Sequence, residues 1–97
     1  MIEKNTPFRS EKWRNAVMSL DFCVRCGAYG VQVAHRNEGK GMGMKVSDCL
    51  SAALCPACHT EIDHGKGMTK EERRAELNAA IVKTVEVLVS HGKVVVA

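Results

Sequence analysis

Two Cys-x-x-Cys pairs constrain this chain more than any other feature of its sequence. The four cysteines follow the pattern C-x2-C-x28-C-x2-C, and they are Cys23, Cys26, Cys55 and Cys58. Each pair brings two thiolates onto one tight turn, and four thiolates complete the tetrahedral coordination of Zn²⁺ without an open position. The pattern therefore predicts a closed, structural zinc site. Such a site would help to hold a chain of 97 residues, which can bury only a limited core.

Neighbouring residues leave alternatives to this assignment. His59 follows Cys58 directly, so a Cys3His site with His59 in place of one cysteine remains open. Cys49 has no partner at ligand spacing, and we interpret it as a small buried apolar residue. The 28 residues between the pairs exceed the usual spacing of a zinc ribbon. We therefore expect a further structural element between the two zinc knuckles.

Hydrophobic periodicity predicts an α+β fold with short elements before a long last helix. Ser10 is a preferred N-cap residue, and the alternation of β-branched residues just before His35 is typical of a strand. The expected elements are a helix from Ser10 to about Leu20, a strand over 31–35, a weaker strand or extended segment over 47–54, and a short helix from the second knuckle to about Gly65.

The last helix, expected over about 69–91, has the clearest pattern. Thr69 and Glu72 form a capping box, and an apolar stripe follows at Leu77, Ile81, Val85 and Leu88. The default role of such a helix is packing. The final residues "VVVA" predict an edge strand or a tail. Together, the helix and these residues would either close the core or support a homodimer.

The charge is distributed unevenly along the chain. Residues 1–45 hold eight Lys or Arg against four acids, a net +4, and residues 46–97 hold six against seven, a net −1. A basic N-terminal half is compatible with nucleic-acid contact or with an ordinary solvated surface. No apolar run is long enough to span a membrane, and no signal-peptide pattern opens the chain. We therefore expect a cytoplasmic protein without a membrane partner, in which paired cysteines bind metal.

Several polar residues have no role in a four-cysteine site. His59 and Asp63 are four residues apart, so a helix places them on one face, as cation ligands or as a hydrogen-bonded pair. His35 ends an apolar strand, where a histidine is more often a core residue than a catalyst. However, strand, loop, strand and helix between two knuckles is a ββα-metal layout. In that layout His35 would face a metal held by the helix and take a proton from water.

The segments "VAHR", "GMGMKVSD" and "CPACHTEID" resemble the small phage and prophage HNH-type, or His-Me finger, nuclease-like family. The resemblance covers about residues 9–65. It implies one domain over 1–97 with a zinc-stabilised ββα-metal core at about 20–67, in a phage or prophage protein of a bacterial host. It also implies that His35 is the general base, that His59 binds a catalytic divalent metal such as Mg²⁺, and that the four cysteines hold structural zinc.

The sequence departs from the family pattern at two places. Many HNH nucleases carry an acidic metal ligand just before the base histidine, and here that residue is Ala34. The middle Asn of the pattern is also missing from "SDCLSAAL". The catalytic metal would therefore need other ligands, for which Asp63, His64 and Asp48 are the candidates.

The glycine-rich loop and its neighbour Arg36 carry basic residues that suit phosphate neutralisation. These are Arg36, Lys40 and Lys45, and the alternative is a charged, soluble loop. The resulting prediction is a metal-dependent endonuclease that hydrolyses phosphodiester bonds in DNA during phage DNA metabolism or recombination. The first alternative is a catalytically degenerate, zinc-containing nucleic-acid-binding accessory protein. A redox protein that uses its Cys-x-x-Cys pairs is a third, weaker interpretation.

Overall fold

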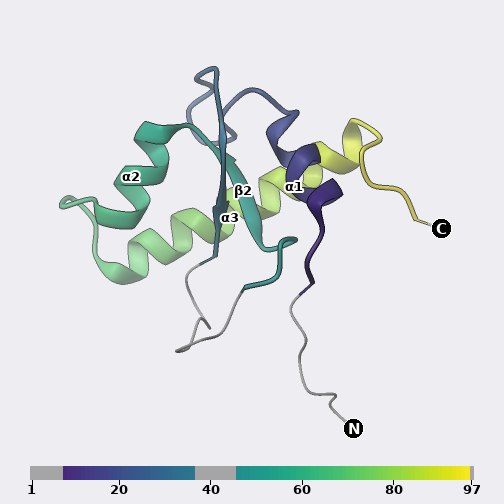
Figure 1. The fold of residues 1–97 in the computed structure, drawn as a ribbon. Coiled ribbons are helices and arrows are strands. Elements are labelled where there is room, and N and C mark those ends of the chain that lie inside the picture. Colours follow the sequence, from purple (N-terminus) through teal and green to yellow (C-terminus); the bar gives the residue numbers. More distant parts are fainter. Residues whose placement is uncertain (1–7, 37–45, 97) are drawn as a thin grey trace, which may run out of the picture.

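The computed structural model describes residues 8–36 and 46–96, and in these it shows a small α+β fold with three helices and a two-stranded antiparallel sheet (Figure 1). The elements are α1 (Glu11–Met18), β1 (Gln32–His35), β2 (Ser51–Leu54), α2 (Pro56–His64) and α3 (Lys70–Ser90). Their order is the one that the periodicity predicts. The first Cys-x-x-Cys pair precedes β1, and the second follows β2 directly.

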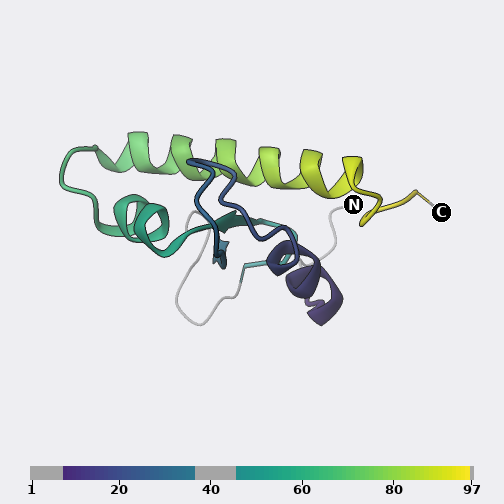
Figure 2. The same cartoon turned by 90° about the horizontal axis from the view of Figure 1, so that it is seen from above.

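The long helix α3 forms one layer, and the remaining elements lie against it (Figure 2). Helix α2 lies against the N-terminal half of α3, and α1 lies against its C-terminal half. The two strands lie between them, with His35 opposite Ser51 in the antiparallel register. All four residues of β2 are buried. This arrangement places the end of β1, where His35 lies, between α1 and α2.

The capping box at the start of α3 is confirmed. The Thr69 hydroxyl accepts the N–H of Glu72 at 3.1 Å, and the Glu72 carboxylate accepts the N–H of Thr69 at 2.8 Å. The buried face of the helix consists of Leu77, Ala80, Ile81, Thr84 and Leu88, whereas Val85 is only half-buried. Thr84 is buried, and its hydroxyl accepts the N–H of Ala53 in β2 at 3.1 Å. This hydrogen bond satisfies a buried backbone donor.

The apolar core has two clusters of buried residues. The first surrounds the cysteines and includes Leu54, Ile62 and Ile81. The second joins α1 to α3 through Val17, Ala53 and Leu88, and the half-buried Trp13 and Leu20 pack against it. The first cluster connects the two knuckles to α3, so the cysteine site and the helix stabilise each other.

The strand expected over 47–54 is shorter in the structure, and of the two alternatives for the C-terminal residues, an edge strand or a tail, the described residues up to Val96 show no strand. Of residues 47–54, only Ser51–Leu54 form a strand, and a turn precedes them, with the Leu50 N–H donating to the Ser47 carbonyl at 3.0 Å. At the other end, the chain leaves α3 through Gly92, whose φ of +72° favours glycine. None of the helices in the described part of the chain has the length and apolar character that crossing a bilayer requires.

Candidate metal centre and histidine site

The four cysteines that the spacing pairs meet in one cluster. Their Sγ atoms all lie within 4.8 Å of one another, and those of Cys26 and Cys55 are 3.6 Å apart. A tetrahedral zinc with Zn–S bonds of ~2.3 Å separates its sulfur atoms by about 3.8 Å. Cys23, Cys55 and Cys58 are buried and Cys26 is exposed, so the cluster lies at the edge of the core. The cluster could therefore hold a structural zinc ion.

The backbone of each knuckle supports thiolate ligands. The N–H of Arg25 donates to the Cys23 sulfur at 3.4 Å, and the N–H of Cys58 donates to the Cys55 sulfur at 3.4 Å. Gly27 closes the first knuckle with a φ of +83°, in the left-handed region. In the second knuckle, Cys55 is also the N-cap residue of α2. Both turns therefore aim backbone donors at sulfur atoms that a metal would keep deprotonated.

The acidities of two of these thiols diverge. Burial and the neighbouring thiols of Cys26, Cys55 and Cys23 raise the pKa of Cys58 to about 12, although its hydrogen bond with Arg25 opposes this shift. Burial would also raise the pKa of Cys23, but backbone N–H donors, including that of Arg25, outweigh it and lower the pKa to about 6. Four thiolates repel one another in so small a volume. A divalent cation offsets the repulsion between the thiolates, and it holds coordinated thiols in the deprotonated form.

Arg25 joins the first knuckle to both of the helices that pack beside it. Its guanidinium group lies 2.7 Å from the carboxylate of Glu61 in α2 and 3.0 Å from that of Glu76 in α3. The hydrogen bond to Glu61, followed by those to Cys58 and Glu76, raises the pKa of Arg25 above its ordinary value. Sequence reasoning missed this residue because its partners lie 36 and 51 positions away.

The Cys3His alternative finds no support in the arrangement of His59. The group of neighbouring ligand atoms consists of the four cysteine sulfurs, and the His59 ring contacts Gln32 and Asp63 instead. Cys49 is half-buried rather than buried, and it lies outside the cluster.

His35 lies at the end of β1, as expected, and its partner is Asp48. The His35 Nε2 atom is 2.9 Å from Oδ1 of Asp48, whose side chain is fully buried, whereas the His35 side chain is about one-third exposed. Asp48 lies in the turn before β2. The turn that shortens the expected strand over 47–54 is thus the same turn that directs Asp48 inward.

Asp48 remains ionised although it is buried. Burial alone would raise its pKa, but the Ser10 N–H, His35 and the guanidinium groups of Arg14 and Arg9 outweigh burial and lower the pKa to about 2. A buried carboxylate is tolerated only when it is paired and hydrogen-bonded, and this one has both kinds of partner.

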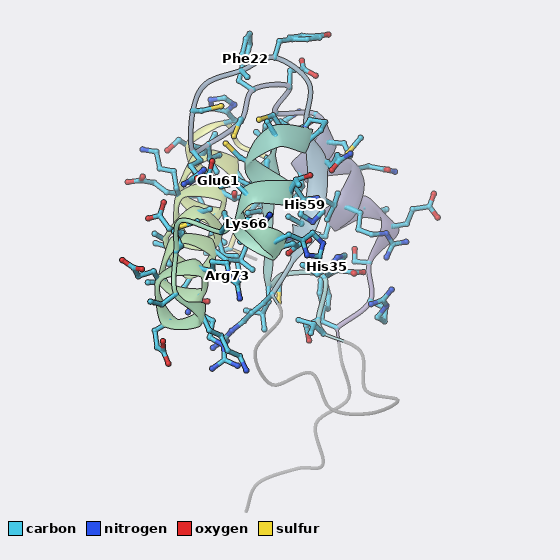
Figure 3. All side chains as sticks on the ribbon, turned by 90° about the vertical axis from the view of Figure 1, so that its left-hand side faces the viewer. Phe22, His35, His59, Glu61, Lys66 and Arg73 are labelled. Carbon is cyan, nitrogen blue, oxygen red and sulfur yellow. The ribbon has the colours of Figure 1, made fainter. Side chains whose placement is uncertain are left out.

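His59 and Asp63 lie on one face of α2, as their spacing predicts. The His59 Nε2 atom is 3.3 Å from Oδ2 of Asp63, and Nδ1 is 2.8 Å from Oε1 of Gln32, the first residue of β1. Figure 3 shows His59 and His35 on the same side of the molecule. His64 is exposed at the end of α2, about 100° around the helix from Asp63. The structure therefore brings His59 to β1 and leaves His64 toward solvent.

In the described part of the chain, the four cysteines are the only group of three or more His, Cys, Asp or Glu ligands with such close ligand atoms. His59 and Asp63 form a pair, and so do His35 and Asp48. Arg36 is half-buried directly after His35. Lys40 and Lys45 lie outside the described residues. The site thus contains one complete cluster and two histidine–aspartate pairs.

Comparisons with known proteins give no match to this chain, neither among protein-family models, nor among curated proteins, nor among solved structures.

Proposed function

We propose that this protein is a metal-dependent endonuclease that hydrolyses phosphodiester bonds in DNA, with an HNH-type ββα-metal core. The observation that carries the proposal is the position of His35. A buried carboxylate holds it at the end of β1, on the side of the molecule where α2 carries the His59–Asp63 pair. Structural zinc in the four cysteines would fix both knuckles, and with them β1 and α2.

The contacts of His59 are compatible with a second, open metal site. A neutral imidazole has one N–H, so His59 cannot donate to both the Gln32 oxygen and the Asp63 carboxylate. When Nδ1 donates to Gln32, Nε2 presents a lone pair to the carboxylate, and a cation between them relieves the repulsion. Adjacent ligands of Mg²⁺, each ~2.1 Å from the ion, lie about 3.0 Å apart, close to the observed 3.3 Å. A doubly protonated ring would also satisfy both acceptors, and so would a rotated Gln32 amide that donates to Nδ1 while Nε2–H donates to Asp63. A metal-binding measurement distinguishes the cation-bound state from these two.

His35 would act as the general base. Its side chain is about one-third exposed, so water can reach the ring while Asp48 holds Nε2. A ring nitrogen that carries a lone pair can take the proton of a water molecule as its oxygen attacks phosphorus. A divalent cation at His59 and Asp63 would stabilise the negative charge on the phosphate and on the leaving oxygen. Arg36, and Lys40 and Lys45 in the glycine-rich loop, are the proposed phosphate contacts.

A second candidate function is nucleic-acid binding without cleavage. Ala34 favours this function, because many HNH nucleases have an acidic metal ligand at that position. The proposed cation would also have only two side-chain ligands, His59 and Asp63. The protein would then be a zinc-containing accessory factor. Binding of DNA without nicking, in the presence or absence of divalent metal and with several substrates, would support this function over hydrolysis.

Replacing His59 by alanine tests the proposed metal site. We expect Mg²⁺- or Mn²⁺-dependent nicking of plasmid DNA to fall by about 10²-fold or more, because the cation loses one of its two side-chain ligands. Zinc content is expected to remain at one ion per chain, since the cluster consists of cysteines. The measurement combines a nicking assay with metal analysis of the purified protein.

Thr60→Ala provides the matched control, because Thr60 is exposed on the same helix and is not one of the two proposed ligands. This variant should nick DNA as the wild type does. A His59→Ala variant with wild-type nicking would contradict the metal site, and loss of zinc would show that His59 belongs to the cysteine cluster instead.

A further inference from the structure

Asp48 is the most completely buried charge in the described residues around the histidines. It has no exposed side-chain surface, and both of its oxygens have partners. Oδ2 accepts the N–H of Ser10 at 2.6 Å and an N–H of Arg14, while Oδ1 lies 2.9 Å from His35 and 3.4 Å from Arg9. These donors fill the positions that a metal ion would need. Asp48 is therefore better suited to hold other side chains than to bind a cation.

The segment before α1 is attached to the same turn by backbone contacts. The Asp48 N–H donates to the Phe8 carbonyl at 2.7 Å, and the Phe8 N–H donates to the Ser47 hydroxyl at 2.8 Å. The Arg9 guanidinium also donates to the Val46 carbonyl at 3.2 Å. Residues at positions 8–14 and 46–48 thus form one hydrogen-bonded unit, and Asp48 connects this unit to the end of β1.

The carboxylate determines which nitrogen of His35 carries hydrogen. An ionised carboxylate only accepts hydrogen bonds, so the 2.9 Å contact requires a hydrogen on Nε2. In a neutral ring, Nδ1 then carries the lone pair. The partner of one ring nitrogen commonly fixes the role of the other in this way.

We propose that Asp48 is a positioning residue, which holds the neutral His35 ring in the tautomer with hydrogen on Nε2 and leaves Nδ1 as the basic atom. It acts through His35 and contacts neither water nor phosphate. The Ser10, Arg9 and Arg14 donors keep the carboxylate ionised and fixed, so the docked segment before α1 contributes to the geometry of His35. The role in hydrolysis rests on the proposed function, whereas the tautomer is a property of the free protein.

Nitrogen-15 NMR of the imidazole ring tests the assignment without DNA. In the zinc-loaded wild type at mildly alkaline pH, we expect one dominant His35 tautomer with hydrogen on Nε2. In Asp48→Asn, the charged acceptor is lost, and the side-chain amide can also donate. We expect the Nδ1–H tautomer to rise to a comparable population, and nicking to fall by about 10- to 100-fold, as for other residues that orient a reactive group.

Asp21→Asn is the matched control, because Asp21 is exposed and its φ of +65° suits asparagine equally well. It should leave both the His35 spectrum and the nicking rate unchanged. A wild-type ring with hydrogen on Nδ1 overturns the proposal, and so does an unchanged tautomer in a folded Asp48→Asn variant. If Asp48→Asn does not fold, the wild-type spectrum still decides. If no DNA is cleaved by the wild type, the proposed function fails while the tautomer result stands separately.

Discussion

Replacing His35 by alanine is expected to reduce DNA nicking by roughly 10²- to 10⁴-fold, the range that a general base typically contributes. The zinc content should remain at one ion per chain, because His35 lies outside the cysteine cluster. The fold should also survive. Asp48 would lose one partner but keep the Ser10 N–H, Arg14 and Arg9, so its buried charge would remain paired.

The control for this variant is His91→Ala, the same substitution at the exposed C-cap position of α3. Nicking assays with matched metal concentrations and thermal unfolding of all three proteins separate catalysis from stability. Full nicking activity in a folded His35→Ala variant would exclude His35 as the general base. An equal loss of nicking activity in His91→Ala would indicate that the loss in His35→Ala comes from reduced stability and not from removal of the general base.

Replacement of Cys58, one of the four cysteines that could hold zinc, is expected to unfold the protein. Structural zinc contributes about 10–16 kcal/mol in zinc-finger peptides, whereas a whole small domain is stable by about 5–15 kcal/mol. Cys58 is buried beside Ile62 in the first core cluster, so loss of the metal also opens the contact of α2 with α3. We expect Cys58→Ser to lack stoichiometric zinc and to show no cooperative thermal transition by circular dichroism. A chelator added to the wild type should have the same effect.

Cys49→Ser is the matched control, since Cys49 is half-buried and lies outside the cluster. It should bind one zinc ion and unfold cooperatively. Retention of zinc and of a cooperative transition in Cys58→Ser would contradict a structural zinc site. Purified wild-type protein without metal but with reversible disulfides would instead favour the redox interpretation of the two Cys-x-x-Cys pairs.

The elements with local signals are the ones that the sequence predicts well. The capping box of Thr69 and Glu72 places the start of α3 correctly, and Ser10 accepts the N–H of Trp13 as the N-cap of α1. The cysteine spacing predicts the cluster because each knuckle is a local turn. The two caps and each Cys-x-x-Cys turn depend on residues a few positions apart, so they can be recognised in the sequence itself. The two turns meet across 28 residues, and only the tetrahedral requirement of zinc predicts that contact.

The interactions that organise the histidine site connect distant positions. Asp48 pairs with Arg14 across 34 residues, and His59 meets Gln32 across 27. No periodicity marks such pairs. The stripe on α3 illustrates a related limit. Val85 fits the apolar spacing, yet Thr84 is the buried residue, because a backbone N–H of β2 needs its hydroxyl. Tertiary hydrogen bonding accounts for Thr84 on a face that is otherwise apolar.

The proposed function requires a second metal ion at His59 and Asp63, apart from the cysteine cluster. A crystal of the zinc-loaded protein soaked in Mn²⁺, with anomalous scattering recorded on both sides of the manganese edge, shows whether this ion binds. We predict zinc in the four cysteines and manganese bound to His59 Nε2 and the Asp63 carboxylate. A soaked crystal with zinc in the cysteines and no manganese at His59 and Asp63 would contradict the proposed function.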